Sequence, residues 1–503
     1  MQSADDRQAP VHIRSAGDAP PVHVPGCYAA AVQLRFSPNG VVMACCRSLQ
    51  PLGNVNTSRL RAMWDGEVRR QQAAHLARGD FSYGCQQCAG EIELEGRAAS
   101  YPSNYDMWEG RVDPSETLVW PRRMEFNLSN ACNLQCLQCD GESSSAIRLH
   151  REGRPALPKV YGPQFFEDLR DFLPHLEEVV FGGGEPFLAA ENFAVWDLMA
   201  ELAPGLDCTV VTNATQWSRR IEDVLARVPM AFVISLDGIT PGTYEEIRKG
   251  ADLEQVLANV DRYAEVARAH GRPVSVNHCL MPQNVHEFPQ FLNWAESKGL
   301  PVDISLVRSP AWASVGRLPV EEIRRVRDDL AARSAEVAGL VLNRATWDAE
   351  LARISAWADA PDGEAPGSGR TVMWFRCQGD GPVDPAPVRD AMRPFAWDGM
   401  VHEAVIGSDD LLRHCDASLT EDAPFLPGQP VLMLTKAVEA RYGAMADYEV
   451  TETGTDVVRA VARFGTTDAQ IVYVARRDDQ GWADDASILL AFRPAADTLA
   501  AAG

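Results

Sequence analysis

Cysteine spacing carries the clearest chemical signal in this 503-residue chain, which has 12 cysteines. One group follows the pattern Cys132-x3-Cys136-x2-Cys139. Three thiolates can hold three irons of a cubane cluster, and the fourth iron then keeps an open position that can chelate the amine and carboxylate of an amino acid. A zinc site that lacks its fourth ligand, or three buried thiols, are the alternative interpretations.

A second cysteine group lies near the N-terminus. Cys27 and Cys45 flank a predicted β-hairpin whose turn is Ser37–Gly40, and a later loop carries Cys85-x2-Cys88. The hairpin brings the first two thiols together, and the x2 spacing lets one loop present two more to the same metal centre. Four thiolates leave no open position, so this site suits electron transfer or substrate anchoring. A structural zinc knuckle is the alternative.

Small and polar residues follow three predicted strands in succession. They form the segments Gly182-Gly183-Gly184-Glu185-Pro186, Thr212-Asn213 and Ser235-Leu236-Asp237-Gly238. Glycines let a ligand approach the backbone, and a glutamate can accept a bond from an ammonium group. Each segment alone is typical of a turn or a helix cap. Their convergence at one edge of a parallel sheet favours a binding site.

The elements that must position these residues alternate between short apolar runs and helical patterns from residue 124 to about 336. This alternation predicts a parallel sheet with covering helices, either a partial barrel or an open doubly wound sheet. Asn284 and Glu287 are a plausible capping pair before Phe288. The predicted strands are Met124–Leu128, Glu178–Gly182, Cys208–Asn213, Ala231–Gly238, Val274–Met281 and Val302–Val307.

The motifs CNLQCLQC, GGGEP, VTNAT and SLDGITPGTYEEIRKG occur in the order seen in the radical S-adenosylmethionine (SAM) superfamily, which the chain strongly resembles. The resemblance implies an α/β fold with a partial (β/α)6, TIM-like barrel, in which a 4Fe-4S cluster reductively cleaves SAM to methionine and a 5′-deoxyadenosyl radical. Gln138 stands where many relatives have an aromatic residue. The resemblance implies cluster ligation by Cys132, Cys136 and Cys139, contact with the methionine amine by Gly183, Gly184 and Glu185, and contact with the carboxylate and ribose by Asn213, Ser235 and Asp237.

The N-terminal pattern Cys27-x12-Gly40-x4-Cys45, Leu52-Gly53-Asn54 and Cys85-x2-Cys88 resembles the twitch module, the shorter relative of the SPASM extension. The resemblance implies a second, auxiliary 4Fe-4S cluster held by Cys27, Cys45, Cys85 and Cys88. In most relatives this module follows the barrel, whereas here it precedes it. Cys46 has no assigned role, and a substitute ligand and a plain buried thiol are both left open for it.

Composition shifts predict five segments. They are a disordered tail (1–25), the iron–sulfur module with its hairpin and helix (26–115), the barrel (116–345), a linker (346–375) and an accessory α+β domain (376–503). The last includes strands Ile471–Ala475 and Ile488–Phe492 and a helical run near Pro430–Tyr442. The cysteines without partner spacing are expected to be buried thiols; they are Cys208, Cys279, Cys377 and Cys415.

Charge and hydropathy limit the classes of partner that the chain is expected to bind. A net charge of −23 disfavours nucleic acid and anionic membrane, and no stretch approaches the ~20 apolar residues of a membrane span. We therefore expect a cytoplasmic enzyme with a peptide or small-molecule substrate and a one-electron donor such as flavodoxin or ferredoxin. It would abstract hydrogen from its substrate in peptide maturation or small-molecule dehydrogenation within natural-product biosynthesis. The alternative is a non-enzymatic iron–sulfur scaffold or redox relay with a peptide-binding C-terminal module, which would not need the GGEP segment.

Overall fold

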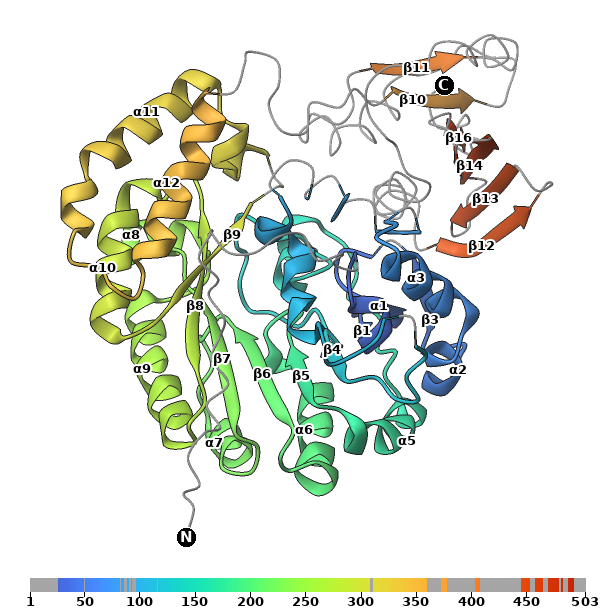
Figure 1. Cartoon of the computed structure of the whole chain (residues 1–503), viewed down its shortest axis with the longest axis horizontal. Helices are drawn as coiled ribbons and strands as arrows, with labels where there is room; N and C mark the ends of the chain where they lie inside the picture. Colours follow the sequence, from blue (N-terminus) through green and yellow to red (C-terminus); the bar gives the residue numbers. More distant parts are fainter. Residues whose placement is uncertain are drawn as a thin grey trace, which may run out of the picture.

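The computed structural model describes residues 26–359, apart from residues 49, 82, 86–87, 90–91, 93–95, 115 and 308–310, and it describes strands between residues 372 and 492. The predicted tail, the linker segment around residues 360–369 and the helical run near residues 430–442 lie outside the described residues. The central element is a nine-stranded sheet with the order β3-β2-β1-β4-β5-β6-β7-β8-β9 (Figure 1).

The six consecutive strands β4 to β9 of this sheet run parallel and correspond to the strands predicted from the alternating pattern. Every predicted strand is confirmed to within a few residues at its ends. This mixed α/β arrangement is consistent with a partial barrel. The strands are β4 (Arg123–Phe126), β5 (Glu178–Phe181), β6 (Asp207–Thr212), β7 (Met230–Ser235), β8 (Val274–Leu280) and β9 (Val302–Leu306).

Helices cover one face of the parallel strands, where alternate strand residues such as Phe126, Phe181 and Val210 enter a continuous apolar core. Trp196 of α6 and Tyr263 of α9 are fully buried against them. Burial of each such side chain contributes roughly 1.5–3 kcal/mol. The covering helices are α5 (Pro163–Phe172), α6 (Ala190–Leu202), α7 (Arg219–Leu225), α8 (Pro241–Ile247), α9 (Leu253–Ala269), α10 (Phe288–Lys298), α11 (Val320–Ala332) and α12 (Arg344–Asp359).

The predicted capping pair before Phe288 is wrong, although α10 does begin there. Neither Asn284 nor Glu287 makes a side-chain cap. The Asn284 amide instead donates to the carbonyls of Asp237 and Cys279, and Glu287 accepts from the backbone N–H of Ile239. Both side chains thus fix the loop that follows β7.

The N-terminal hairpin is confirmed, and it joins the main sheet. Strand β1 (Gln33–Phe36) pairs antiparallel with β2 (Val41–Met43), which pairs with β3 (Pro51–Asn54). Strand β1 also pairs in parallel with β4, with Gln33 opposite Arg123. Phe36, Phe126 and Phe181 stack across β1, β4 and β5 at centroid distances of 5.4 and 5.0 Å. Backbone pairing and this aromatic row therefore attach the module to the edge of the barrel.

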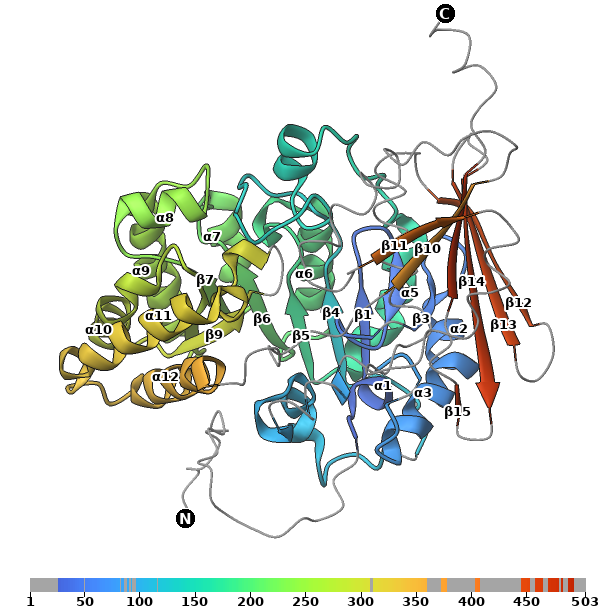
Figure 2. The ribbon, with the colours of Figure 1, turned by 90° about the horizontal axis from the view of Figure 1, so that it is seen from above.

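Three short helical segments complete the N-terminal part, and Figure 2 shows them beside the first strands. They are α1 (Ala29–Val32), α2 (Leu60–Trp64) and α3 (Glu67–Ala77), followed by a 3-10 helix at Tyr101–Trp108. The last turn of α3 reaches the module's first residues, because the Gly26 N–H donates to the Leu76 carbonyl. The module is thus closed on itself as well as joined to β4.

A second sheet lies in the C-terminal part, with the order β11-β10-β16-β14-β13-β12 and β15 (Gly481–Trp482) paired to β14. The two predicted strands fall within β14 (Ala469–Asp478) and β16 (Ser487–Phe492), which pair antiparallel. The domain boundaries drawn from composition stay predictions. The other strands are β10 (Val372–Cys377), β11 (Glu403–Gly407), β12 (Met445–Glu452) and β13 (Val457–Phe464).

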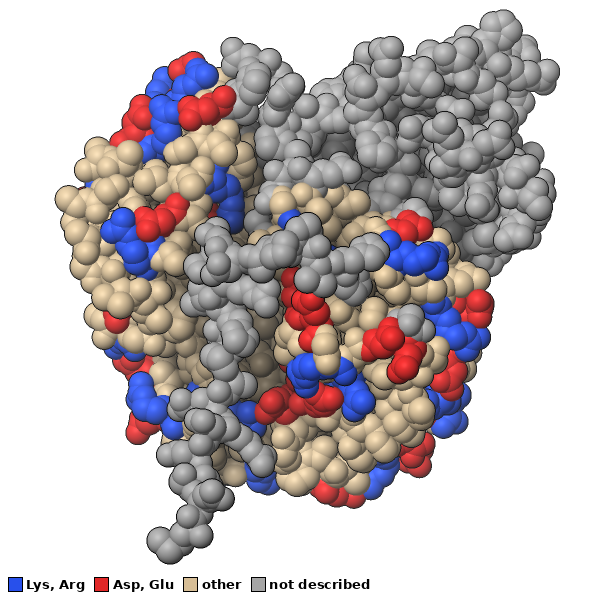
Figure 3. All heavy atoms as spheres, in the orientation of Figure 1, with Lys and Arg blue, Asp and Glu red and all other residues tan. Residues whose placement is uncertain are grey.

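Acidic and basic side chains are interspersed on the described surface seen in Figure 3. Many of them form ion pairs with each other, for example Arg170 with Glu201 and Arg227 with Asp197. Exposed pairs of this kind contribute little to stability. No helix within the described ranges has the length and apolar character required to cross a membrane.

Candidate active site

The loop that carries the three-cysteine motif lies against the carboxyl end of β5. The N–H of Gly184 donates to the Ser129 carbonyl, and the N–H of Glu185 donates to the Ala131 carbonyl. A Cβ atom on Gly184 would lie 2.3 Å from the Ala131 oxygen. Any larger residue would therefore push the loop away. Gly183 has φ of +96°, a conformation that favours glycine. These glycines set the position of the cysteine loop, and their contact with the methionine amine stays a prediction.

Glu185 lies beneath this loop and is fully buried. Its carboxylate accepts from the Thr212 hydroxyl at 2.8 Å, from the Asn213 N–H at 2.8 Å and from the Phe187 N–H at 3.2 Å. Burial raises the pKa of Glu185 to about 7, and these hydrogen bonds oppose that rise. The carboxyl is therefore close to half-ionised at neutral pH, so its charge responds to a ligand that donates to it.

Asn213 connects the end of β6 to the first cysteine. Its amide lies 3.8 Å from the Cys132 sulfur and 3.4 Å from the Asn133 side-chain oxygen. Its own oxygen accepts from Thr215. Ser235 ends β7, is half-buried and stands opposite Asn277 of β8. Their SAM contacts stay predictions, and the structure brings Asn213 directly to the cysteine loop.

Asp237 is fully buried just after β7, where protein groups surround its carboxylate. One oxygen accepts from the Gln138 amide at 2.7 Å and pairs with Arg248 at 2.8 Å, while the other accepts from the Cys279 N–H at 2.8 Å. The ribose contact expected for Asp237 stays a prediction, and this geometry favours a role in holding the cysteine loop.

The three cysteines are free thiols on one loop, and Cys132 and Cys139 are partly exposed while Cys136 is buried. The pKa of Cys136 is lowered to about 7, first by a hydrogen bond with Cys139 and then by the charge of Arg248, which together outweigh burial. Arg151 donates to the carbonyls of Cys136 and Cys139. The hydrogen bond with Cys136 and burial raise the pKa of Cys139, and burial raises the pKa of Cys132, so Cys136 is the thiol of the three that ionises most readily. Three donors on one loop fit a cluster with one open iron. Among the described residues, no group of three or more His, Cys, Asp or Glu side chains is already arranged around a single metal ion.

The second set of cysteines has a different environment. Cys27, Cys45, Cys85 and Cys88 are all buried, and the first three belong to one apolar cluster with Trp108. Burial raises the pKa of Cys27 to about 11 and that of Cys85 to about 12. Such thiols ionise only when a metal replaces their protons. Four enclosed sulfur donors therefore fit a closed cluster.

Cys46 is set apart from these four, since it is exposed and donates to the Tyr101 hydroxyl at 2.9 Å. Cys279 is partly exposed, so the expectation of a buried thiol holds for Cys208 but not for Cys279. Cys377 lies on β10, and Cys415 lies outside the described residues.

The two cysteine sets lie at opposite ends of the parallel strands. Cys132 follows the carboxyl end of β4, whereas the chain enters β1 after Cys27 and leaves β2 before Cys45, beside the amino end of β4. The Arg122 N–H, just before β4, donates to the Val32 carbonyl and confirms this placement. The barrel strands thus separate the two sites.

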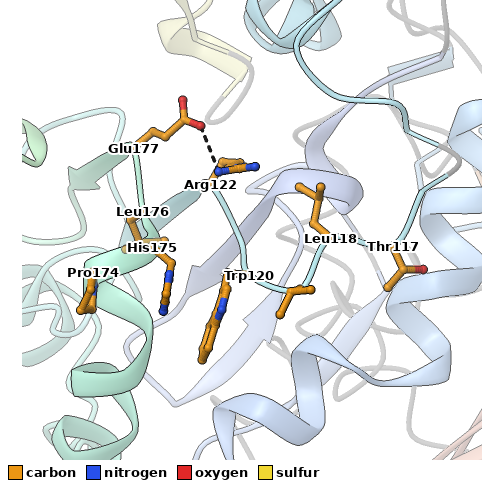
Figure 4. A pocket seen from close by; sticks show the side chains of 9 residues that line it. Thr117, Leu118, Trp120, Arg122, Pro174, His175, Leu176 and Glu177 are labelled. Atoms are coloured by element: carbon orange, nitrogen blue, oxygen red, sulfur yellow. Dashed lines mark ion pairs between the residues drawn. The ribbon is translucent and has the colours of Figure 1, made fainter.

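A cavity lies at the amino ends of β4 and β5, away from the three-cysteine loop (Figure 4). Trp120 stacks on His175 at 4.2 Å, and Arg122 pairs with Glu177 at its rim. Its position separates it from the strand ends that carry the polar motifs. We therefore place the candidate site at the cysteine loop and not in this cavity.

Sequence reasoning missed Arg248 and assigned no structural role to Gln138. Arg248 follows α8 and is buried between Asp237 and Cys136. Its signal in the sequence was its place in the segment SLDGITPGTYEEIRKG, which ends two residues after it. An arginine at the end of a short helix usually extends into solvent, so its spacing in the sequence alone does not assign it a buried partner.

Comparisons with known proteins match the two parts of the chain that carry the cysteine sets. The model of the Radical SAM superfamily matches residues 126–295, and that of the SPASM iron–sulfur cluster-binding domain matches residues 27–89. GTP 3′,8-cyclase of Rhodococcus opacus is 28% identical over 185 residues, which cover 36% of this chain and 49% of that protein. The Caulobacter vibrioides enzyme of the same name is 29% identical over 215 residues, covering 41% and 54%. The chain thus spans about half the length of these curated relatives.

Two solved structures are also similar. One is anSMEcpe with bound AdoMet, at 16% identity and a TM-score of 0.33, covering 42% of this chain and 61% of that one. The other is Streptococcus suis SuiB bound to the precursor peptide SuiA, at 15% identity and a TM-score of 0.33, covering 62% and 71%.

Proposed function

Because the chain is a radical SAM enzyme with an N-terminal SPASM iron–sulfur domain, we propose that it abstracts hydrogen from a polar substrate held between its two iron–sulfur sites, and that the auxiliary site assists oxidation or anchoring. Its cofactors are a SAM-binding 4Fe-4S cluster, SAM and an auxiliary iron–sulfur cluster. When bound, the SAM-binding cluster supplies the electron that cleaves SAM to methionine and a deoxyadenosyl radical.

The observation that carries this proposal is the placement of a partly exposed set of three cysteines and an enclosed set of four at opposite ends of the same strands. An open set suits a substrate-binding metal centre, and a closed set suits electron transfer. A substrate between them can lose hydrogen at one end and an electron at the other. A scaffold without catalysis would not need a buried carboxylate such as Glu185 beneath the cysteine loop.

The face of the sheet away from the helices supports a polar substrate. On β4 it presents Arg123 and Glu125, which pair with Glu178 and Arg35 respectively. On β8 and β9 it presents neutral and acidic groups that are at least partly exposed, namely Ser275, Asn277, Asp303 and Ser305. These groups already pair with one another, as Ser305 does by donating to Asn277 at 2.7 Å, and their remaining hydrogen-bond capacity suits a polar substrate better than an apolar one. Both a peptide and a small alcohol meet this requirement.

The test is deoxyadenosine formation by anaerobic, iron-reconstituted enzyme given SAM and a strong one-electron reductant. We expect deoxyadenosine and methionine in equal amounts, slowly without substrate. A protein with both sites fully loaded that forms no deoxyadenosine would show that the chain is a scaffold or relay. Metabolite comparison between cells with wild-type and Cys132→Ala protein would then identify the substrate class.

A further inference from the structure

The segment after α8 lies directly against the three-cysteine loop. The Gln135 N–H donates to the Lys249 carbonyl at 2.9 Å, and the Leu137 N–H donates to the Ile247 carbonyl at 2.9 Å. Arg248 lies between these two contacts, and its own N–H donates to the Tyr244 carbonyl. Backbone pairing on both sides therefore fixes Arg248 beside Cys136.

The side chain of Arg248 bridges an acid and a sulfur. One guanidinium nitrogen lies 2.8 Å from an Asp237 oxygen, and another lies 3.9 Å from the Cys136 sulfur, within hydrogen-bond range for sulfur. The Arg248 side chain is 7% exposed and that of Asp237 is not exposed. An unpaired charge buried this deeply would be very unfavourable, so Asp237 is what keeps the cation beside the cysteine.

The three cysteines of the loop have unequal surroundings. Cys136 faces a buried cation, whereas the Cys132 sulfur contacts the neutral side chains of Asn213 and Ser144. Arg151 adds positive charge at the Cys136 and Cys139 carbonyls, and Gln138 completes the Asp237 contacts. The positive charge is therefore concentrated on one corner of the site.

We propose that Arg248, held by Asp237, is a positioning residue that sets the reduction potential of the SAM-binding cluster through Cys136. The inference rests on the proposed function, because it requires that cluster to be present. Hydrogen bonds and charge at a ligating sulfur tune iron–sulfur potentials. Reduction adds one electron from an external donor and increases the negative charge on the sulfurs. A fixed cation that donates to one of them stabilises the reduced state and so raises the potential.

The experiment is a dithionite titration of the full-length, reconstituted protein followed by electron paramagnetic resonance. The signal that changes when SAM is added identifies the SAM-binding cluster and separates it from the auxiliary one. We expect Arg248→Met to retain iron and to lower the equilibrium constant for one-electron reduction about tenfold, which is about 59 mV. The matched control is Arg272→Met, which removes an arginine paired with Asp207 at the amino end of β6 and should leave the potential unchanged.

Arg248→Lys keeps a positive charge with one bridging contact fewer, so its potential should fall below wild type by less than tenfold. This variant decides the question should Arg248→Met fail to retain iron. An Arg248→Met protein with intact iron and a wild-type potential would overturn the inference, as would an Arg248→Lys potential at or above wild type. Wild-type protein that binds no SAM-responsive cluster would instead overturn the proposed function.

Discussion

The two cysteine sites differ in what surrounds their sulfurs. At the carboxyl end of the barrel, Cys132 and Cys139 are partly exposed, and charged or amide groups contact the loop. At the amino end, Cys27 and Cys45 are enclosed with Trp108 in an apolar cluster. An exposed, polar setting lets a ligand reach the metal, and an enclosed, apolar one excludes it. This difference supports the proposal that the first set serves the reaction and the second serves electron transfer or anchoring.

The largest effect is expected when the first site is removed and the second is left intact. Cys132, Cys136 and Cys139 replaced together by Ala should abolish deoxyadenosine formation, because no iron then has an open position for SAM. About four irons per chain with a cubane-like spectrum should stay at the second site. Iron analysis and electronic spectra measure this, with Cys208→Ala as a control that removes one buried thiol outside both sites. Retention of one zinc and no iron would show that the second site is a structural knuckle.

A smaller effect is expected at the ligand side of the first site. Glu185→Ala removes a buried carboxylate that we expect to accept from the methionine amine. Loss of such a charge-assisted bond costs about 1.5–3 kcal/mol, or about 10- to 150-fold in SAM affinity. Calorimetric titration with SAM measures it. Glu296→Ala, which removes a carboxylate that accepts from the Val341 and Leu342 N–H groups away from the cysteine loop, is the control and should bind SAM normally.

Iron content separates a lost SAM contact from a lost cluster as the cause of weak SAM binding by the Glu185→Ala protein. Full iron with weak SAM binding places the carboxylate at the ligand. An affinity equal to wild type would show that Glu185 only holds Thr212 and Asn213 in place.

The sequence predicted the parallel strands and the three-cysteine loop because both depend on local patterns. Each strand and the cysteine motif involve residues fewer than ten positions apart, and the alternation of strands with helices predicts the parallel pairing. The pairing of β1 with β4 was not predicted, since it joins Gln33 to Arg123 across a long intervening segment. A hairpin pattern fixes its own register but does not say which outer strand it will meet.

The environment of Asp237 could not be predicted from the sequence either. Its type and strand-end position are typical of a ligand contact or a cap, and the structure instead surrounds it with Gln138, Arg248 and the Cys279 N–H. These partners come from the cysteine loop, the segment after α8 and strand β8. Only the packed barrel decides which polar group near the strand ends faces a ligand and which is satisfied internally.

A further prediction concerns pH at the first site alone. The pKa of Glu185 is raised to about 7, so its carboxyl is mostly protonated below pH 7 and mostly ionised above it. The ionised form accepts the stronger hydrogen bond, so SAM affinity should increase about five- to tenfold from pH 6 to pH 8. Glu185→Gln cannot ionise, and its pH profile supplies the part that comes from SAM itself. Parallel profiles for the two proteins would contradict the assignment.

The smallest effect is expected at the hairpin of the second site. Gly40 has φ of +83°, and a Cβ atom there would lie 3.0 Å from the Asn54 side-chain oxygen. Gly40→Ala should therefore destabilise the protein by about 1–2 kcal/mol, through backbone strain and this contact. Gly271→Ala is the matched control, because Gly271 has φ of +66° but a Cβ atom there would meet nothing within 4 Å. Thermal unfolding of both variants isolates the contribution of the contact.

The hairpin turn also sets the pairing of Arg35 with Met43, and through it the approach of Cys45 to Cys27. Gly40→Ala should consequently lose iron to a chelator faster at the auxiliary site, while the SAM-responsive signal decays as in wild type. Equal loss at both sites would break the contrast between them. Because β1 pairs with β4, that result would mean that strain in the hairpin reaches the barrel, and that the two iron–sulfur sites form one cooperative unit.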